Sequence, residues 1–323
     1  MKSRNIFVLF FVLPIVTVET GVFDFFDVFF DKDNLRAFDP DDFEKDLRKS
    51  LYGQHIALEA ILKAVTWFMK DPDPPKPLVL SLHGPTGVGK THVTKIIARN
   101  IYEMGEKSKH VHTLISSYDF PHKSESAVYE DQLKAWIHGN VSRFSRSMFV
   151  FDEMDKMNPH VIDIIKPFLD YVPHVKGVSF HNAIFIFLSQ AGGNVINNWT
   201  LDFWRKGKDR DELQMKIMET EIYQDIFNDK NNGFWQSCLI DHHLVDHFIP
   251  FLPLELKHVR ECVLAEMTNL NVPLDHRLAD RVAREMPFFP PEEKIFSVKG
   301  CKSVRADLVQ YAWCTKSWCN DNP

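Results

Sequence analysis

The chain has 323 residues, of which 45% are apolar and 25% are charged, and its formal net charge is -6 at pH 7. This length allows a sizeable core and two domains, and the composition is that of a soluble globular protein. The negative charge excludes a general electrostatic attraction to nucleic acid.

The N-terminus has the charge order of a secretory signal. Lys2 and Arg4 precede an apolar run at residues 6–18, which is too short to span a bilayer comfortably. We predict a signal peptide over residues 1–20, with an uncleaved anchor as the alternative. Residues 21–37 form a Phe-rich apolar segment that either rests at a membrane interface or packs on the domain that follows.

Sequons and cysteines agree with a secretory location. Asn140 and Asn198 each begin an Asn-x-Ser/Thr triplet and are predicted glycosylation sites. Because the number of cysteines is odd, at least one stays free or pairs between chains if the others form disulfides. The alternative is that all are reduced and buried. The cysteines are Cys238, Cys262, Cys301, Cys314 and Cys319.

Residues 84–91 match the phosphate-binding loop pattern G-x-x-x-x-G-K-[ST]. An apolar run of strand length at 78–82 precedes the loop, and a helical apolar pattern follows it from Val93. Backbone N–H groups can therefore face the phosphates of ATP from a helix N-terminus, while Lys90 adds positive charge and Thr91 offers its hydroxyl to Mg²⁺. The predicted nucleotide-binding residues of the loop are Gly84, Pro85, Thr86, Gly87, Val88, Gly89, Lys90 and Thr91.

Two further apolar runs end in polar residues that suit nucleotide hydrolysis. The run at 148–151 is followed by Asp152, which can hold Mg²⁺ through water, and by Glu153, which can orient or deprotonate an attacking water. The run at 183–188 leads to Gln190, which can reach the γ-phosphate or the water. The alternative for Gln190 is that it only caps the following turn.

The alternation of strands and helices predicts an α/β fold, a doubly wound parallel sheet with the nucleotide at the carboxyl ends of its strands. A further strand is expected at 111–116 and a helix around 132–137. Residues 38–252 form the large nucleotide-binding domain, and the run at 239–251 closes it. Helical patterns predict a small lid domain over residues 253–323. These patterns lie at 256–270, 275–286 and 303–313.

With phosphate loop, acid pair, strand-tip polar residue and helical lid in this order, the chain resembles AAA+ ATPases of the Clp-type branch, and within that branch the torsins. The resemblance covers roughly residues 38–310. The strings that carry it, beside the phosphate loop, are KIIA at 95–98, FDEMDKM at 151–157, IKPFLDY at 165–171, DFWR at 202–205 and GCK at 300–302.

The resemblance implies an ATP-binding protein of the endoplasmic reticulum lumen and the nuclear envelope that works on membrane or protein assemblies. Lys302 takes the place of the sensor-2 residue of the lid, and Tyr52 and Gln54 fall where Clp-type proteins contact adenine. Torsins are thought to pair the cysteine of the GCK string with another lid cysteine. This implies a disulfide between Cys262 and Cys301 that tunes nucleotide binding.

The sequence departs from the torsin pattern at two positions. Many torsins carry Asn at the position of Thr91, so the Mg²⁺ site of this chain is expected to be nearer to that of ordinary P-loop ATPases. Gln190 is one methylene longer than the usual Asn, which makes water positioning by this residue uncertain.

Residues 237–246 contain no arginine at the place where Clp-type ATPases donate one to a neighbouring subunit. Loss of such an arginine costs on the order of a thousandfold in rate. His242 and His243 are poor substitutes, because an unperturbed histidine is charged only below about pH 6.5. The sequence therefore predicts an ATPase that is weak alone. Torsins also lack this arginine, which implies a membrane-anchored partner whose luminal domain donates it.

Other functions and assemblies stay open at this stage. One alternative is an ATP-locked binding module or scaffold in which hydrolysis is incidental, and another is a small-molecule kinase. A kinase needs arginines in a mobile lid, and no such arrangement is recognisable. Homo-oligomerisation and peripheral membrane association are both compatible with the sequence. Residues 118–121 lack the aromatic-hydrophobic-glycine pattern of a pore loop, which weakens a threading function.

Overall fold

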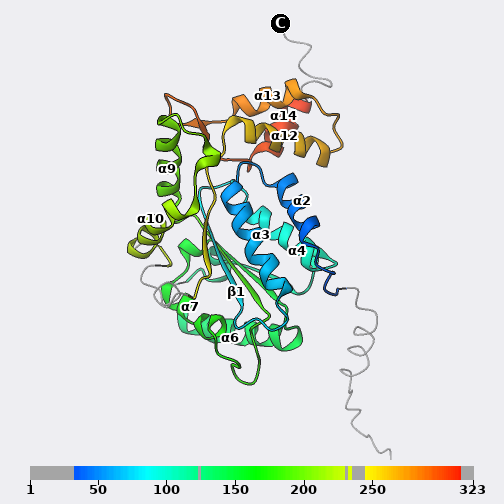
Figure 1. The fold of residues 1–323 in the computed structure, drawn as a ribbon, viewed down its shortest axis with the longest axis vertical. Helices are drawn as coiled ribbons and strands as arrows, with labels where there is room; N and C mark the ends of the chain where they lie inside the picture. The colour runs from blue at the N-terminus through cyan, green and yellow to red at the C-terminus, as the bar shows by residue number, and fades with distance from the viewer. Residues whose placement is uncertain (1–32, 123–124, 230–231, 235–243, 314–323) are drawn as a thin grey trace, which may run out of the picture.

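The computed structural model describes residues 33–122, 125–229, 232–234 and 244–313 (Figure 1). Its centre is a five-stranded sheet in the order β2-β3-β4-β1-β5, in which every neighbouring pair is parallel. The predicted α/β parallel fold is therefore confirmed. The strands are β1 (Leu78–His83), β2 (Val111–Ile115), β3 (Met148–Asp152), β4 (Ile184–Ser189) and β5 (His247–Pro250).

Helices cover both faces of the sheet, and a helical lid lies above its carboxyl edge at the top of Figure 1. The longer helices of the large domain are α2 (Pro40–Ser50), α3 (His55–Lys70), α4 (Lys90–Ile101), α6 (Ser126–Arg143), α9 (Gly193–Arg205) and α10 (Met215–Asn228). Its short elements are η1 (Gly105–Lys107), α5 (Ser116–Asp119), η3 (Met154–Lys156), α7 (Pro159–Asp163), α8 (Lys166–Leu169) and η4 (Arg210–Glu212). The lid holds α12 (Leu256–Asn269), α13 (His276–Glu285), the strand pair β6 (Phe288–Phe289) and β7 (Phe296–Ser297), and α14 (Val304–Trp313).

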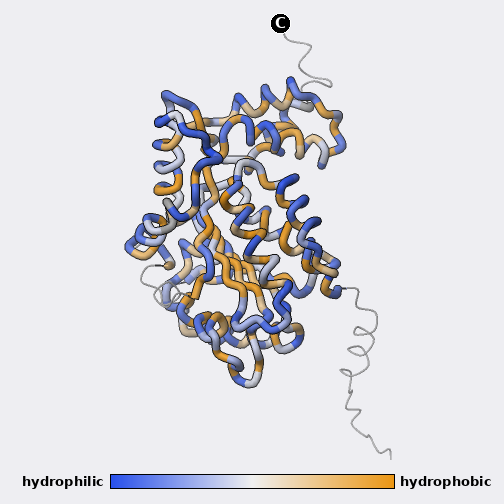
Figure 2. Tube along the Cα trace, in the orientation of Figure 1, coloured by the Kyte–Doolittle hydropathy of each residue, from blue (hydrophilic) through white to orange (hydrophobic). Residues whose placement is uncertain are grey.

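The alternation of side chains along the strands divides the core in two. Leu80 and Leu82 of β1 face α3 and α4, and this half of the core continues into the lid helices. Val79 faces the opposite side, where α6, α9 and α10 pack. Both sides of a parallel sheet are buried in this way, so its central strands are mostly apolar, as Figure 2 shows for the centre of the molecule.

The second half of the core holds many of the 27 phenylalanines of the chain. Phe149 and Phe185 stack on neighbouring strands with ring centroids 5.0 Å apart, and Phe151 and Phe187 repeat the contact at 5.5 Å. Such aromatic pairs contribute beyond the area they bury, by roughly 0.5–1.5 kcal/mol each. The Phe-rich face of the sheet therefore packs against α6, α9 and α10.

Several elements were not predicted from the sequence. Helix α2 has a clear start signal, because the Asp39 carboxylate accepts from the backbone N–H groups of Asp41 and Asp42 and Pro40 occupies the first turn. Helices α9 and α10 and the β6–β7 pair were also missed. The helix expected around 132–137 is the middle of the longer α6.

Some predictions fall outside the described residues. These are the signal peptide at 1–20, most of the Phe-rich segment, and most of the stretch examined for an arginine. In the part of the chain that the structure describes, no helix combines the length and the apolar character needed to cross a bilayer.

Candidate nucleotide site

The phosphate-binding loop joins the end of β1 to the start of α4. Gly87 and Gly89 have φ angles of 73° and 107°, a backbone region that side chains rarely adopt, and Gly89 is the N-cap residue of α4. The amide end of the helix therefore opens into the loop, where an anion is stabilised by N–H groups and by the helix dipole.

Lys90 lies along the inside of this loop. Its Nζ donates to the carbonyl oxygens of Gly84 and Pro85, at 2.5 and 2.8 Å. Burial lowers the pKa of Lys90 to about 8, and the carboxylates of Asp152 and Asp155 oppose that shift. A partly desolvated ammonium held among carbonyl groups is suited to receive phosphate oxygens, which are stronger acceptors.

The hydroxyl and carboxylate predicted to hold Mg²⁺ meet in the structure. Thr91 Oγ1 of α4 is 3.4 Å from Asp152 Oδ2 at the end of β3. The backbone carbonyl of Asp152 accepts from the Ser116 hydroxyl at 2.9 Å, which ties the end of β3 to α5. Mg²⁺ takes a few hard oxygen ligands from the protein and the rest from phosphate and water, so this donor pair fits the ion.

Glu153 follows directly and carries two partners that the sequence did not reveal. Its carboxylate accepts from Lys156 Nζ at 2.7 Å and from the Ser117 hydroxyl. Lys156 holds the pKa of Glu153 below its usual range, with further contributions from Ser117 and from Lys302. The side chain is therefore an anion, and Ser117 and Lys156 determine where it points. The FDEMDKM string contained Lys156 but gave no role for it.

The turn after β4 is fixed to the acidic strand end. The backbone N–H of Gln190 donates to Asp155 Oδ1 at 2.9 Å, and the Ser189 hydroxyl donates to the same oxygen at 3.3 Å. The Gln190 side chain itself is exposed and lines the cavity next to the loop. Asp155 is a site residue that sequence reasoning missed, since the residue lies beyond the acid pair.

The lid closes the site through its backbone. The N–H of Cys301 donates to the carbonyl oxygen of Gly87 in the phosphate loop, at 2.9 Å. Cys301 is bonded to Cys262 of α12 with an S–S distance of 2.00 Å, so the pairing implied by the torsin resemblance is present. Lys302 follows Cys301, is exposed, and faces the same cavity.

These residues surround one cavity of about 1140 Å³ between the large domain and the lid. It brings together the predicted nucleotide-binding and catalytic residues except Gly84, Pro85 and Gln54, which do not line it. Its lining includes Tyr52, Thr86, Gly87, Val88, Gly89, Lys90, Thr91, Asp152, Glu153, Asp155, Gln190, Cys301 and Lys302.

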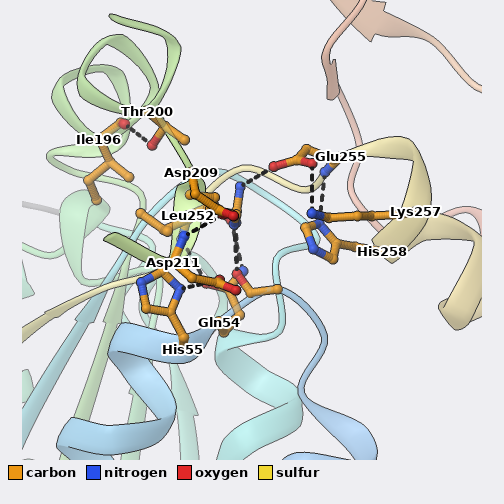
Figure 3. A network of polar contacts seen from close by, with 12 residues as sticks. Gln54, His55, Ile196, Thr200, Asp209, Asp211, Leu252, Glu255, Lys257 and His258 are labelled. Carbon is orange, nitrogen blue, oxygen red and sulfur yellow. Dashed lines mark hydrogen bonds and ion pairs between the residues drawn. The ribbon is translucent and has the colours of Figure 1, made fainter. Parts of the chain in front are cut away.

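The structure corrects the prediction for Gln54. Only 1% of this residue is exposed, and it does not line the cavity. Its amide nitrogen donates to the carbonyl oxygen of Val88 at 3.1 Å. It also donates to the carbonyl oxygen of Leu252, and the amide oxygen accepts from Leu252 N–H, both at 2.8 Å (Figure 3). Gln54 therefore ties the phosphate loop to the chain that enters the lid. Tyr52, in contrast, lines the cavity as expected.

A buried arginine joins the same region to the lid through an ion pair. The Arg210 guanidinium donates to the Gly53 carbonyl oxygen at 2.7 Å and lies 3.3 Å from a carboxylate oxygen of Glu255. Burial lowers the pKa of Arg210 to about 10, and the Glu255 carboxylate opposes that shift. Figure 3 shows Glu255 beside His258, whose ring nitrogen accepts from Glu255 N–H at the start of α12. No sequence pattern pointed to Arg210.

Comparison with known proteins agrees with this geometry. A protein-family model described as Torsin matches residues 25–151, and a second, described as Torsin-1A, C-terminal domain, matches residues 254–311. The chain belongs to the torsin family. The first of these torsin matches covers the phosphate loop and β3 as far as Phe151, and the second covers the lid with its disulfide.

A solved structure, the S. cerevisiae Hsp104-ADP complex, is similar to this torsin-family chain with a TM-score of 0.60 and 17% sequence identity. The match covers 85% of this chain and 48% of that one, so the chain spans about half the length of the Hsp104 chain. The likeness establishes an AAA+ fold. Together with the torsin matches, it identifies an AAA+ ATPase of the torsin type.

The two predicted glycosylation sites of this torsin-family chain both lie on helices. Asn198 is exposed on α9, and the Thr200 hydroxyl of its sequon donates to the Ile196 carbonyl oxygen. Asn140 lies on α6, and its amide nitrogen donates to the Trp136 carbonyl oxygen at 2.8 Å. Attachment of a glycan at either asparagine stays a prediction.

Proposed function

We propose that this torsin-family ATPase binds ATP with Mg²⁺, hydrolyses it slowly alone, and is activated by a membrane-anchored partner that donates an arginine in trans. Its place of work in this proposal is the lumen of the endoplasmic reticulum and the nuclear envelope. There it remodels protein or membrane assemblies as a chaperone-like enzyme. The main support for this proposal is that one cavity is lined by Lys90, Thr91, Asp152, Glu153 and Lys302.

Each of these side chains has a distinct task. The loop N–H groups and Lys90 hold the β- and γ-phosphates, while Thr91 and Asp152 hold Mg²⁺, which supplies charge neutralisation during phosphoryl transfer. Glu153 orients the attacking water and accepts its proton. Lys302 approaches from the lid, so a closed lid adds a positive charge at the γ-phosphate end.

The arginines near the site support a need for an external one. Among the described residues, Arg99 and Arg305 line the cavity. Arg99 Nε donates to the Lys95 carbonyl oxygen of its own helix, and Arg305 pairs with Glu266 of the lid at 3.2 Å. These contacts each use one nitrogen of the guanidinium group, and neither is with the phosphate loop. Stabilisation of the charge that develops on the γ-phosphoryl group then depends on an arginine from another chain.

The test is ATP turnover by the purified mature chain, after ATP binding has been established, without and then with a detergent extract of endoplasmic reticulum membranes. We expect binding with little turnover alone and an increase of about a thousandfold with the extract. Glu153→Gln is the control, because it keeps nucleotide binding and removes the catalytic carboxylate. Fast turnover by the chain alone would contradict the proposal and favour a self-sufficient homo-oligomer.

The Cys301–Gly87 hydrogen bond favours one alternative function, an ATP-locked binding module. In that case bound ATP sets the lid and creates a partner surface, and hydrolysis is incidental. Glu153→Gln distinguishes the two functions in cells. It abolishes function if turnover is required, and it preserves function in a scaffold.

The compartment is tested by glycosylation. In translation with microsomes, the chain should gain mass that an endoglycosidase removes, and Asn140→Gln with Asn198→Gln should abolish the gain. A chain that stays unmodified and accessible to added protease would exclude the luminal location.

A further inference from the structure

A fully buried histidine lies at the base of the phosphate loop. His83 is the last residue of β1, directly before Gly84, and its ring packs near those of Phe234 and Phe248 at centroid distances of 5.8 and 5.6 Å. A polar ring in aromatic surroundings is costly unless its nitrogen atoms are hydrogen-bonded. The partners of the two ring nitrogens therefore determine what this side chain does.

The two nitrogens have different and fixed roles. Nδ1 is 3.1 Å from the carbonyl oxygen of Ala191, which can only accept, so Nδ1 carries the hydrogen. Burial lowers the pKa of His83 to about 3, so the ring is neutral at physiological pH and Nε2 is an acceptor. The Ser81 hydroxyl, 2.6 Å from Nε2, is then the donor. One tautomer is selected.

The Ala191 carbonyl oxygen, which accepts from His83 Nδ1–H, belongs to the turn that carries Gln190. On one side of Gln190, the Ser189 carbonyl oxygen accepts from Gly84 N–H at 3.3 Å. On the other side, the Ala191 carbonyl oxygen accepts from His83. The last residue of β1 and the first residue of the phosphate loop thus hold both neighbours of the cavity-lining glutamine.

We propose that His83 is a positioning residue for ATP hydrolysis, which fixes the Gln190 turn relative to the phosphate loop through its Nδ1–H bond to Ala191. The inference rests on the proposed ATPase function. His83 contributes to the hydrolytic step rather than to ATP binding, because the loop N–H groups and Lys90 do not depend on the bond between His83 and Ala191.

The variants His83→Asn and His83→Gln test it as a matched pair. The amide nitrogen of Asn reaches the position of Nδ1 and keeps a donor for Ala191, whereas the amide group of Gln reaches the position of Nε2 and loses that donor. Both variants bury one side-chain amide at the same position, so they are matched in polarity. The measurements are the affinity for a fluorescent ATP analogue and the single-turnover rate of ATP hydrolysis with excess protein.

We expect His83→Gln to hydrolyse ATP roughly tenfold more slowly than His83→Asn, with affinities within about threefold of each other, because small misplacements near a reacting centre lower rates strongly. A double-mutant cycle adds a readout that a general structural role does not move. If His83 acts through Gln190, the rate falls no further when His83→Gln is added to Gln190→Ala. Equal rates for the Asn and Gln variants, or additive losses in the cycle, would overturn the proposal.

A measurement on the unaltered chain covers the case in which both variants unfold. With ¹⁵N-labelled histidine, the nuclear magnetic resonance spectrum of His83 should show a neutral ring protonated at Nδ1 between pH 5 and 7. Protonation at Nε2 would overturn the inference. Failure of the proposed ATPase function would give a different result. The unaltered chain would then show no ATP binding, or no hydrolysis with the membrane extract.

Discussion

The backbone N–H of Cys301 in the lid donates a hydrogen bond to the carbonyl oxygen of Gly87 in the phosphate loop, at 2.9 Å. The two backbone segments approach so closely that a Cβ atom on Gly300 would lie 2.3 Å from the same carbonyl oxygen. Lid position and loop conformation are therefore coupled through backbone atoms. Any change that moves the lid at this point also moves the loop that holds phosphate.

Gly300→Ala should separate the lid from the loop. Gly300 has a φ of 53°, so the substitution adds both backbone strain and the clash with Gly87. We expect the affinity for ATP to fall by about tenfold or more, equivalent to about 1.4 kcal/mol. The control is Gly207→Ala, where φ is 68° and a Cβ meets nothing within 4 Å. That variant carries the strain alone and should bind ATP normally, and equal losses in both variants would contradict the role of the contact.

Reduction of the Cys262–Cys301 disulfide should loosen the lid. The bond closes a loop with a sequence separation of 39, and such a crosslink stabilises the folded state by about 2–4 kcal/mol. The free energy of unfolding in urea should fall by that amount with a reductant, and ATP affinity should fall with it. The variant with Cys262→Ser and Cys301→Ser should match the reduced chain and ignore the reductant. Peptide mapping that finds both thiols free, or paired elsewhere, would refute the prediction.

Two arginines join the large domain to the lid, and burial separates their effects. The Arg210 side chain is 6% exposed and pairs with Glu255, whereas Arg205 is 50% exposed and pairs with Glu293 at 2.6 Å. Arg210→Met removes the donor to the Gly53 carbonyl oxygen and leaves Glu255 with Lys257 as its ion partner, and it should cost about 1–3 kcal/mol of unfolding free energy. Arg205→Met should cost less than about 1 kcal/mol. Urea unfolding measures both losses. A similar loss in the two variants would show that burial of the arginine does not determine how much its ion pair contributes to stability.

The parts of the site that were predicted are contiguous in sequence. The run of β1, the loop and the start of α4 form one local pattern, and Asp152 and Glu153 directly follow a buried strand. Hydrophobic periodicity and turn residues encode such features within a few positions. Lys302, in contrast, has no such local pattern and was assigned only through the torsin resemblance.

The parts that were missed depend on distant partners. Gln54 bonds to Leu252, 198 positions away, and Arg210 bonds to Gly53, 157 positions away. Gln54 was predicted to contact adenine because it falls where Clp-type proteins do so, and only the fold reveals that its amide group is already hydrogen-bonded. Buried polar groups require partners, but the sequence does not state which ones.

The neutral state of His83 predicts how stability depends on pH. Its pKa is about 3 in the folded protein, against about 6.5 in an unfolded chain. Below pH 6.5 the unfolded chain therefore takes up a proton that the folded protein refuses until about pH 3, so acidification favours unfolding. Between pH 7 and 5 this single group lowers the free energy of unfolding by about 2 kcal/mol.

His83→Asn isolates that contribution, because an amide does not titrate. Urea unfolding at pH 7 and pH 5 should show a loss about 2 kcal/mol smaller in the variant than in the unaltered chain. His112 and His258, whose pKa values burial lowers to about 4 and about 3, remain in both proteins and cancel in the comparison. An equal loss in the two chains would mean that His83 is protonated in the folded protein or exposed to water. A protonated ring donates from both nitrogens, so the single tautomer on which the link to Ala191 depends would then be wrong.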